Sequence, residues 1–166
     1  MPATVGDQLI LALFVAPLVV GAAFDLWRFR IPNAVTGAML ALFPVAGLAA
    51  GQPVEWQWHA AAGAVVFVPM AALFAAGIIG GGDAKLLTVT ALWLGWDLLL
   101  PFLMLTVIFG GVLALLILMA RNPALEALFL MAGARPQVLQ KEAGIPYGIA
   151  IAAAGCWLAL QLPLIG

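Results

Sequence analysis

Two aspartates stand at the ends of long apolar runs, where an acidic side chain is costly unless it has a use. Asp25 ends the first apolar run, and Asp83 directly follows three glycines. A carboxylate at the edge of a hydrocarbon layer is expensive unless it is paired, hydrated or functional. Two such groups in a partly dry site can share one proton. The ionised one can then take a proton from water while the protonated one polarises an amide carbonyl, which is the chemistry of peptide hydrolysis without metal or covalent intermediate.

Glycines 80–82 predict a break or bend in the chain before Asp83. Consecutive glycines give a helix no side-chain packing and carry a large entropy cost. Without side chains, they would also let an extended substrate backbone approach Asp83. The simpler alternative is a polar turn between two membrane helices, in which Asp83 caps the second helix and Lys85 extends to lipid headgroups. These residues alone leave both interpretations open.

The composition predicts a membrane protein. Hydrophobic residues make up 66% of the chain and charged residues only 8%, and the mean hydropathy is +1.20, so too few polar side chains exist to cover a soluble domain. We expect an all-α, polytopic integral membrane helix bundle, forming one domain over residues 1–166. A net charge of -1 offers no basic stripe for nucleic acid. The single cysteine, Cys156, can form neither an intrachain disulfide nor a multi-cysteine zinc site, and we predict no metal or cofactor.

Six helices are expected to position the two aspartates. The N-terminal stretch has no basic residue, so the first apolar run is expected to stay as a membrane helix. Pro69 is expected to kink the third helix. The fourth is short for a membrane span, which fits a site recessed into the membrane. The connection 121–144 is expected to hold a short surface helix. The apolar runs predict helices over about residues 8–24, 32–50, 60–79, 84–96, 98–120 and 145–164.

Charge predicts the orientation of these helices. With six crossings, all six basic residues fall on one side of the membrane: Arg28, Arg30, Lys85, Arg121, Arg135 and Lys141. The other side carries only the acids Asp7, Glu55 and Asp97. The positive-inside rule therefore places the first side in the cytoplasm and the N-terminus outside. Asp25 and Asp83 are then expected at the same cytoplasmic membrane edge.

His59 is the one histidine of the chain and lies near the membrane interface in the sequence 51–59. It could act as a ligand or a base. No Cys or other His stands at metal-ligand spacing from it, so a structural role is the stronger expectation.

Three motifs together resemble the type IV prepilin peptidases, which are membrane aspartyl proteases. The first is Phe-Asp-Leu at 24–26 with Arg28, Arg30 and Ile-Pro-Asn at 31–33. The second is Gly-Gly-Gly-Asp-Ala-Lys at 80–85, and the third is Ile-Pro-Tyr-Gly at 145–148. The resemblance spans essentially the whole chain. It implies an endopeptidase at the cytoplasmic face of the bacterial inner membrane that cuts the short basic leader from prepilins or pseudopilins, usually after a glycine.

The same resemblance implies roles for individual residues. Asp25 and Asp83 match the catalytic pair. Gly80, Gly82 and Lys85 belong to the second motif, where Lys85 either tunes the pair, holds a substrate carboxylate or is only an interfacial anchor. The late segment is matched by Tyr147 and Lys141, without an assigned role. Leader recognition is expected to involve Glu126, Glu142 or lipid headgroups.

Larger members of that family carry a cytoplasmic domain with two Cys-any-any-Cys pairs, and they also methylate the new N-terminus. This chain, with one cysteine, resembles the short form of tight-adherence pilus systems, which processes small Flp-type pilins and pseudopilins. Neither methylation nor zinc is therefore expected. A different class stays open at this point, because two acids at one face could also serve a proton-coupled transporter or a membrane assembly subunit.

Overall fold

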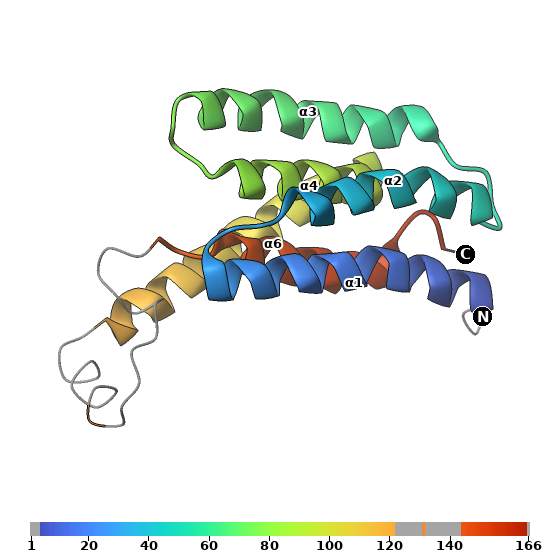
Figure 1. Ribbon diagram of the computed structural model, residues 1–166. Helices are drawn as coiled ribbons and strands as arrows, with labels where there is room; N and C mark the ends of the chain where they lie inside the picture. Colours follow the sequence, from blue (N-terminus) through green and yellow to red (C-terminus); the bar gives the residue numbers. More distant parts are fainter. Residues whose placement is uncertain (1–3, 122–130, 132–143, 166) are drawn as a thin grey trace.

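The computed structural model describes residues 4–121, 131 and 144–165, and over these residues its regular structure is entirely helical. The all-α prediction is confirmed for this part of the chain. Figure 1 shows an elongated bundle in which neighbouring helices run side by side. Its elements are α1 (Val5–Arg28), α2 (Asn33–Ala49), α3 (Trp56–Ala75), α4 (Gly81–Ala120), α6 (Tyr147–Leu158) and the short 3-10 helix η2 (Ala159–Gln161).

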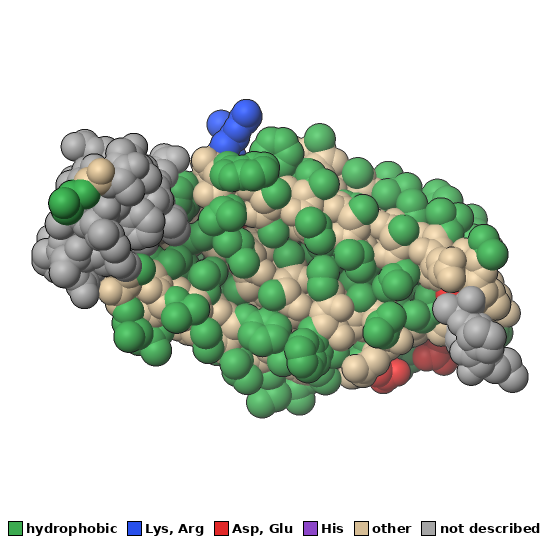
Figure 2. All heavy atoms as spheres, turned by 90° about the horizontal axis from the view of Figure 1, so that it is seen from below, with side chains coloured by type: hydrophobic (Ala, Val, Ile, Leu, Met, Phe, Trp, Pro, Cys, Tyr) green, Lys and Arg blue, Asp and Glu red, His purple; other side chains and the backbone are tan. Residues whose placement is uncertain are grey.

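Three of these helices, α1, α3 and α4, are long and apolar enough to cross a membrane, and α2 and α6 with η2 are shorter apolar helices. The predicted count of six spans is therefore not established by length and composition. Large hydrophobic side chains are exposed along the outside of the bundle. Figure 2 shows a face covered mostly by such side chains, with basic groups toward one end and acidic groups toward the other. This is the surface expected of a membrane protein.

α4 is one element that behaves as two helices. Gly95 inside it has φ 72° and ψ −174°, a backbone conformation that only glycine adopts easily. After this residue the second half of α4 runs back toward the end of the molecule where the first half began (Figure 1). The sequence predicted two helices meeting near residue 97, and the reversal lies two positions earlier.

His59 supports this reversal. Its Nδ1 lies 2.8 Å from the carbonyl oxygen of Leu92, and because a carbonyl only accepts, Nδ1 is the donor. The ring is buried, packs against Phe43 with centroids 5.2 Å apart, and lies against Gly95. His59 therefore has the structural role expected for it.

Replacing His59 by alanine should lower stability by about 1–3 kcal/mol, because the Leu92 carbonyl loses its partner and the ring leaves a cavity. Thermal unfolding in detergent, followed by tryptophan fluorescence, measures this. Gln57→Ala, at an exposed position of the same helix, is the matched control. Equal midpoints for the two variants would contradict the role given to His59.

The core is built around the first half of α4. Trp93, fully buried there, donates its indole N–H to the carbonyl of Met39 on α2 at 2.9 Å. Its ring also contacts Phe14 of α1 and Phe43 of α2. A buried indole with a satisfied N–H fixes its neighbours in both distance and direction. α1 and α2 are thereby held against the helix that begins with Asp83.

Two predicted boundaries were wrong around the glycines. α3 ends at Ala75, not near residue 79, and the turn after it contains Gly77 with φ 72°. The predicted break before Asp83 is present between α3 and α4 and includes Gly80, the extended N-cap of α4. α4 itself begins at Gly81 and not at Ala84, so residues 81–83 form its first helical turn. The predicted surface helix within 121–144 lies outside the described residues except for Arg121, Met131 and Gly144.

Candidate active site

Asp25 and Asp83 come together although they lie far apart in the sequence. Asp25 is in the last turn of α1 and Asp83 in the first turn of α4. Both line one cavity of about 260 Å³, as the sequence predicted for these two residues. The other residues around it are Phe29, Arg30, Ile31, Asn33, Gly80, Gly81, Gly82 and Lys85. The predicted supporting residues Gly80, Gly82 and Lys85 therefore also reach this cavity.

Asp25 is buried, with 5% of its surface exposed, and it is held by α6. Its Oδ2 accepts a hydrogen bond from the backbone N–H of Gly148 at 2.7 Å. A carboxylate at the C-terminal end of α1 is disfavoured by the dipole of that helix, whereas the N-terminus of α6 favours it. The carboxylate is thus oriented by a helix that starts more than a hundred residues later.

Gly148 was not recognised from the sequence as a partner of Asp25. The backbone at Gly148 lies so close to Asp25 and Ile31 that only glycine fits without a shift. A Cβ there would lie 2.8 Å from Asp25 Oδ2 and 2.9 Å from Ile31 Cδ1. A signal existed in the motif at 145–148: Pro146 marks a helix start, and the first N–H groups of a helix have no partner within it. The sequence could not indicate which carboxylate they would meet.

Asp83 differs from Asp25 in its partners. Its Oδ1 is buried and has no hydrogen-bond partner among the described protein groups. The N-cap of α4 is Gly80, and no side chain caps this helix end, so the simple capping role considered for Asp83 is not observed. Asp25 lines the same cavity as Asp83. Burying a carboxylate oxygen without a hydrogen-bond partner costs folding free energy. Such unfavourable groups are found at functional sites.

The glycines before Asp83 let the chain pack closely around the cavity. A Cβ on Gly82 would lie 3.0 Å from Ile31 Cβ, and one on Gly80 would lie 3.0 Å from Asp83 Oδ2. A Cβ on Gly81 would lie 2.9 Å from the ring of Phe74 on α3. Gly82 therefore allows the loop after α1 to lie directly on the start of α4. This contact is part of what brings the two aspartates to one cavity.

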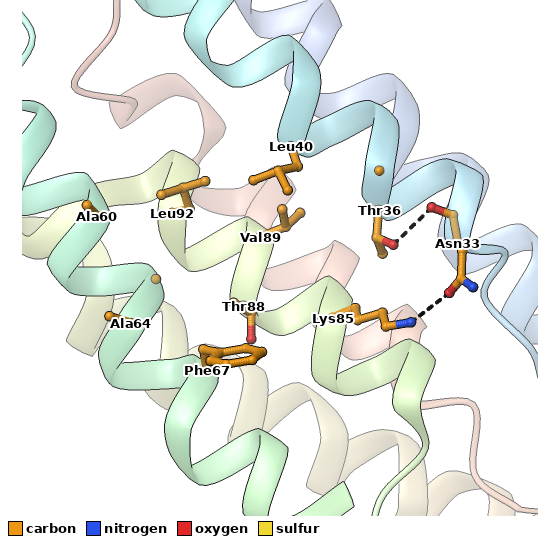
Figure 3. A pocket seen from close by; sticks show the side chains of 12 residues that line it. Asn33, Thr36, Leu40, Ala60, Ala64, Phe67, Lys85, Thr88, Val89 and Leu92 are labelled. Carbon is orange, nitrogen blue, oxygen red and sulfur yellow. Dashed lines mark hydrogen bonds between the residues drawn. The ribbon is translucent and has the colours of Figure 1, made fainter.

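Lys85 joins the starts of two helices. Its Nζ donates to Oδ1 of Asn33, the first residue of α2, at 2.9 Å (Figure 3). The side chain is exposed and also lines the aspartate cavity. The bridge to Asn33 is a further role, beyond the three that were considered for Lys85 from the sequence.

The other residues singled out from the sequence lie in different places. The Arg28 guanidinium stacks over the ring of Phe24 at 5.6 Å, and with Arg30 it lines a second cavity of about 340 Å³. Tyr147 packs against Gly110 of α4, so its contact is with the bundle. Lys141, like Glu126 and Glu142, lies outside the described residues. In the described part of the chain, no three His, Cys, Asp or Glu side chains are grouped as they would be at a metal site.

Comparison with known proteins gives one finding. A family model described as the type IV leader peptidase family matches residues 12–115, a range that includes both Asp25 and Asp83. No curated protein and no solved structure matches the chain. The matched range ends before α6, so Gly148 is known to face Asp25 only from the structure. Because the family model covers more than half of the 166 residues, this chain belongs to the type IV leader peptidase family.

Proposed function

We propose that this protein is a membrane-embedded aspartic endopeptidase that removes the leader from prepilins or pseudopilins, with Asp25 and Asp83 as its catalytic pair. The observation that carries the proposal is the shared cavity, which both carboxylates line in a member of the leader peptidase family. Family membership favours this chemistry over the transport and assembly alternatives.

The reaction requires the two carboxyl groups to share one proton. The ionised one takes a proton from water, and the resulting hydroxide attacks the scissile carbonyl while the protonated one donates to the carbonyl oxygen. The departing amine then takes up the proton that the first carboxylate removed from water, and the C–N bond breaks. As the carbonyl group re-forms, its oxygen returns a proton to the second carboxylate. Gly148 fixes the direction of Asp25, and Oδ1 of Asp83 is open to a hydrogen bond from water or substrate. No metal takes part in these steps.

The size of the cavity suits this role. A volume of about 260 Å³ exceeds by several times the roughly 30 Å³ that one water takes up in the liquid. It can therefore admit a water together with a short stretch of extended peptide. Burial on the protein side strengthens the electrostatic effect of each carboxylate on the reacting atoms.

We further propose that the cavity faces the cytoplasm from the inner membrane of a bacterium, with the N-terminus outside. Four basic residues lie at the end of the bundle that holds the cavity, near the end of α1, the start of α2 and both ends of α4. They are Arg28, Arg30, Lys85 and Arg121. The acids Asp7, Glu55 and Asp97 lie near the start of α1, the α2–α3 connection and the reversal of α4. This asymmetry is the one that the positive-inside rule describes.

Incubation of the purified protein with a Flp-type prepilin in detergent tests the proposal. We expect one cut at the junction of leader and mature sequence, located by mass spectrometry, and an unchanged rate after treatment with a chelator. Loss of cleavage on chelation would point to a metalloprotease and contradict the aspartate mechanism. An intact precursor after prolonged incubation with well-folded protein would contradict the peptidase activity itself.

A further inference from the structure

An apolar groove opens beside the aspartate cavity. Its walls are α2 and α3, which pack on α4 more than on each other, and its floor is the first half of α4 (Figure 3). The groove encloses about 580 Å³. Its large apolar side chains are Leu40 of α2, Phe67 of α3, and Val89 and Leu92 of α4.

The groove and the aspartate cavity are adjacent. Asn33 and Lys85 line both of them, and the hydrogen bond between these two side chains lies where they meet. From Lys85 to Leu92 the floor extends for about 10 Å at the helical rise of 1.5 Å per residue. A chain leaving the aspartates past Lys85 therefore enters an apolar channel about two helical turns long.

We infer that this groove holds the apolar segment of the substrate on the mature side of the scissile bond. The inference rests on the proposed peptidase function. An occupant must be apolar to replace lipid against Leu40, Phe67 and Leu92. Small residues, including Gly37 and Ala64, line the walls and permit the close approach of another helix within a membrane.

The connection to the aspartates decides which apolar occupant fits. A lipid acyl chain could fill the groove, but an apolar chain gains no favourable contact by continuing into a cavity with two carboxylates. A polypeptide that is cut at the aspartates must leave the cavity on both sides of the bond. The groove gives its hydrophobic side a path that begins at Asn33 and Lys85.

Gly37 provides a sharp test. A Cβ at this position would have no atom within 4 Å, so a larger side chain can start into the groove from here, and leucine is also the better helix former. Gly111, on the second half of α4, is equally open and does not line the groove, so Gly111→Leu is the matched control. Two substrates are compared: a precursor with its whole apolar segment, and one truncated shortly after the cut site.

Gly37→Leu should lower the ratio of kcat/KM for the whole precursor over the truncated one by tenfold or more, whereas Gly111→Leu should leave this ratio at its wild-type value. A second readout does not depend on cleavage. A photoreactive label on Gly37→Cys, with Cys156→Ala and Asp83→Asn to remove the native thiol and the activity, should crosslink to the apolar segment of the precursor. The same label on Gly111→Cys should not.

The outcomes separate this inference from the proposed function. If the wild type cuts the precursor but Gly37→Leu leaves the ratio unchanged, or the label captures only lipid, the groove assignment is overturned and the peptidase stands. If the wild type cuts nothing while position 37 still crosslinks to the apolar segment, the groove binds this segment and the peptidase function is overturned.

Discussion

Asp25→Asn and Asp83→Asn should each leave the prepilin uncut while the protein accumulates at its normal level. Asparagine can neither take a proton from water nor carry the shared proton. We therefore expect kcat to fall by about 10²- to 10⁴-fold for either change. The side chain keeps its shape and an acceptor oxygen, and the hydrogen bond from Gly148 can persist at position 25. The measurement is precursor processing on immunoblots, followed by kcat with the purified variants.

Asp97→Asn is the matched control for this pair. Asp97 is an exposed acid just after the reversal of α4, outside the aspartate cavity, and its replacement should leave processing intact. Processing that survives at Asp25→Asn or at Asp83→Asn would reject the two-carboxylate mechanism. A transporter or an assembly subunit would show no processing in any variant, including the wild type.

Gly148→Ala should reduce cleavage nearly as severely, although position 148 carries no reactive group. The added methyl would stand 2.8 Å from Asp25 Oδ2 and 2.9 Å from Ile31 Cδ1, so either the carboxylate or α6 must shift. A displacement of about 1 Å at a reacting group can cost on the order of 10²-fold in rate. We expect that loss in kcat/KM for the purified variant.

The stability of Gly148→Ala distinguishes misplacement from unfolding. Alanine is the better helix former by roughly 1 kcal/mol, and position 148 lies in the first turn of α6, so helix propensity alone does not predict a loss of structure. Gly111→Ala, where the new methyl meets open space, should keep full activity. Normal cleavage by Gly148→Ala would show that the contact with Asp25 does not position the carboxylate.

The helical membrane class and the candidate aspartates could be predicted from the sequence. Long apolar runs and the placement of the few charges are properties of local sequence, and a bilayer imposes its thickness on any such run. Asp25 and Asp83 stood out because an acid at the end of such a run needs a reason to be there. Membership of the type IV leader peptidase family is confirmed by the match over residues 12–115.

Predictions failed where one local signal fits two structures. Glycine is compatible with a chain break and also with close packing at a helix start. For Gly82 the outcome was decided by Ile31, which lies against it in the folded chain and has no local relation to it in the sequence. The reversal at Gly95 likewise lies against His59, whose side chain comes from a different helix and hydrogen-bonds to Leu92.

The amino-acid sequence by itself determined that this chain is helical and apolar, and it indicated Asp25 and Asp83 as candidate catalytic residues. Only the tertiary structure decided that Gly148 holds Asp25, that Oδ1 of Asp83 is buried without a partner among the described residues, and that an apolar groove shares Asn33 and Lys85 with the aspartate cavity. The physical reason is the range of the interactions. Hydrophobicity and helix formation act over neighbouring residues. The contacts of Asp25 and the groove, in contrast, exist only in the folded bundle, where α6 packs on α1 and where α2 and α3 pack separately on α4.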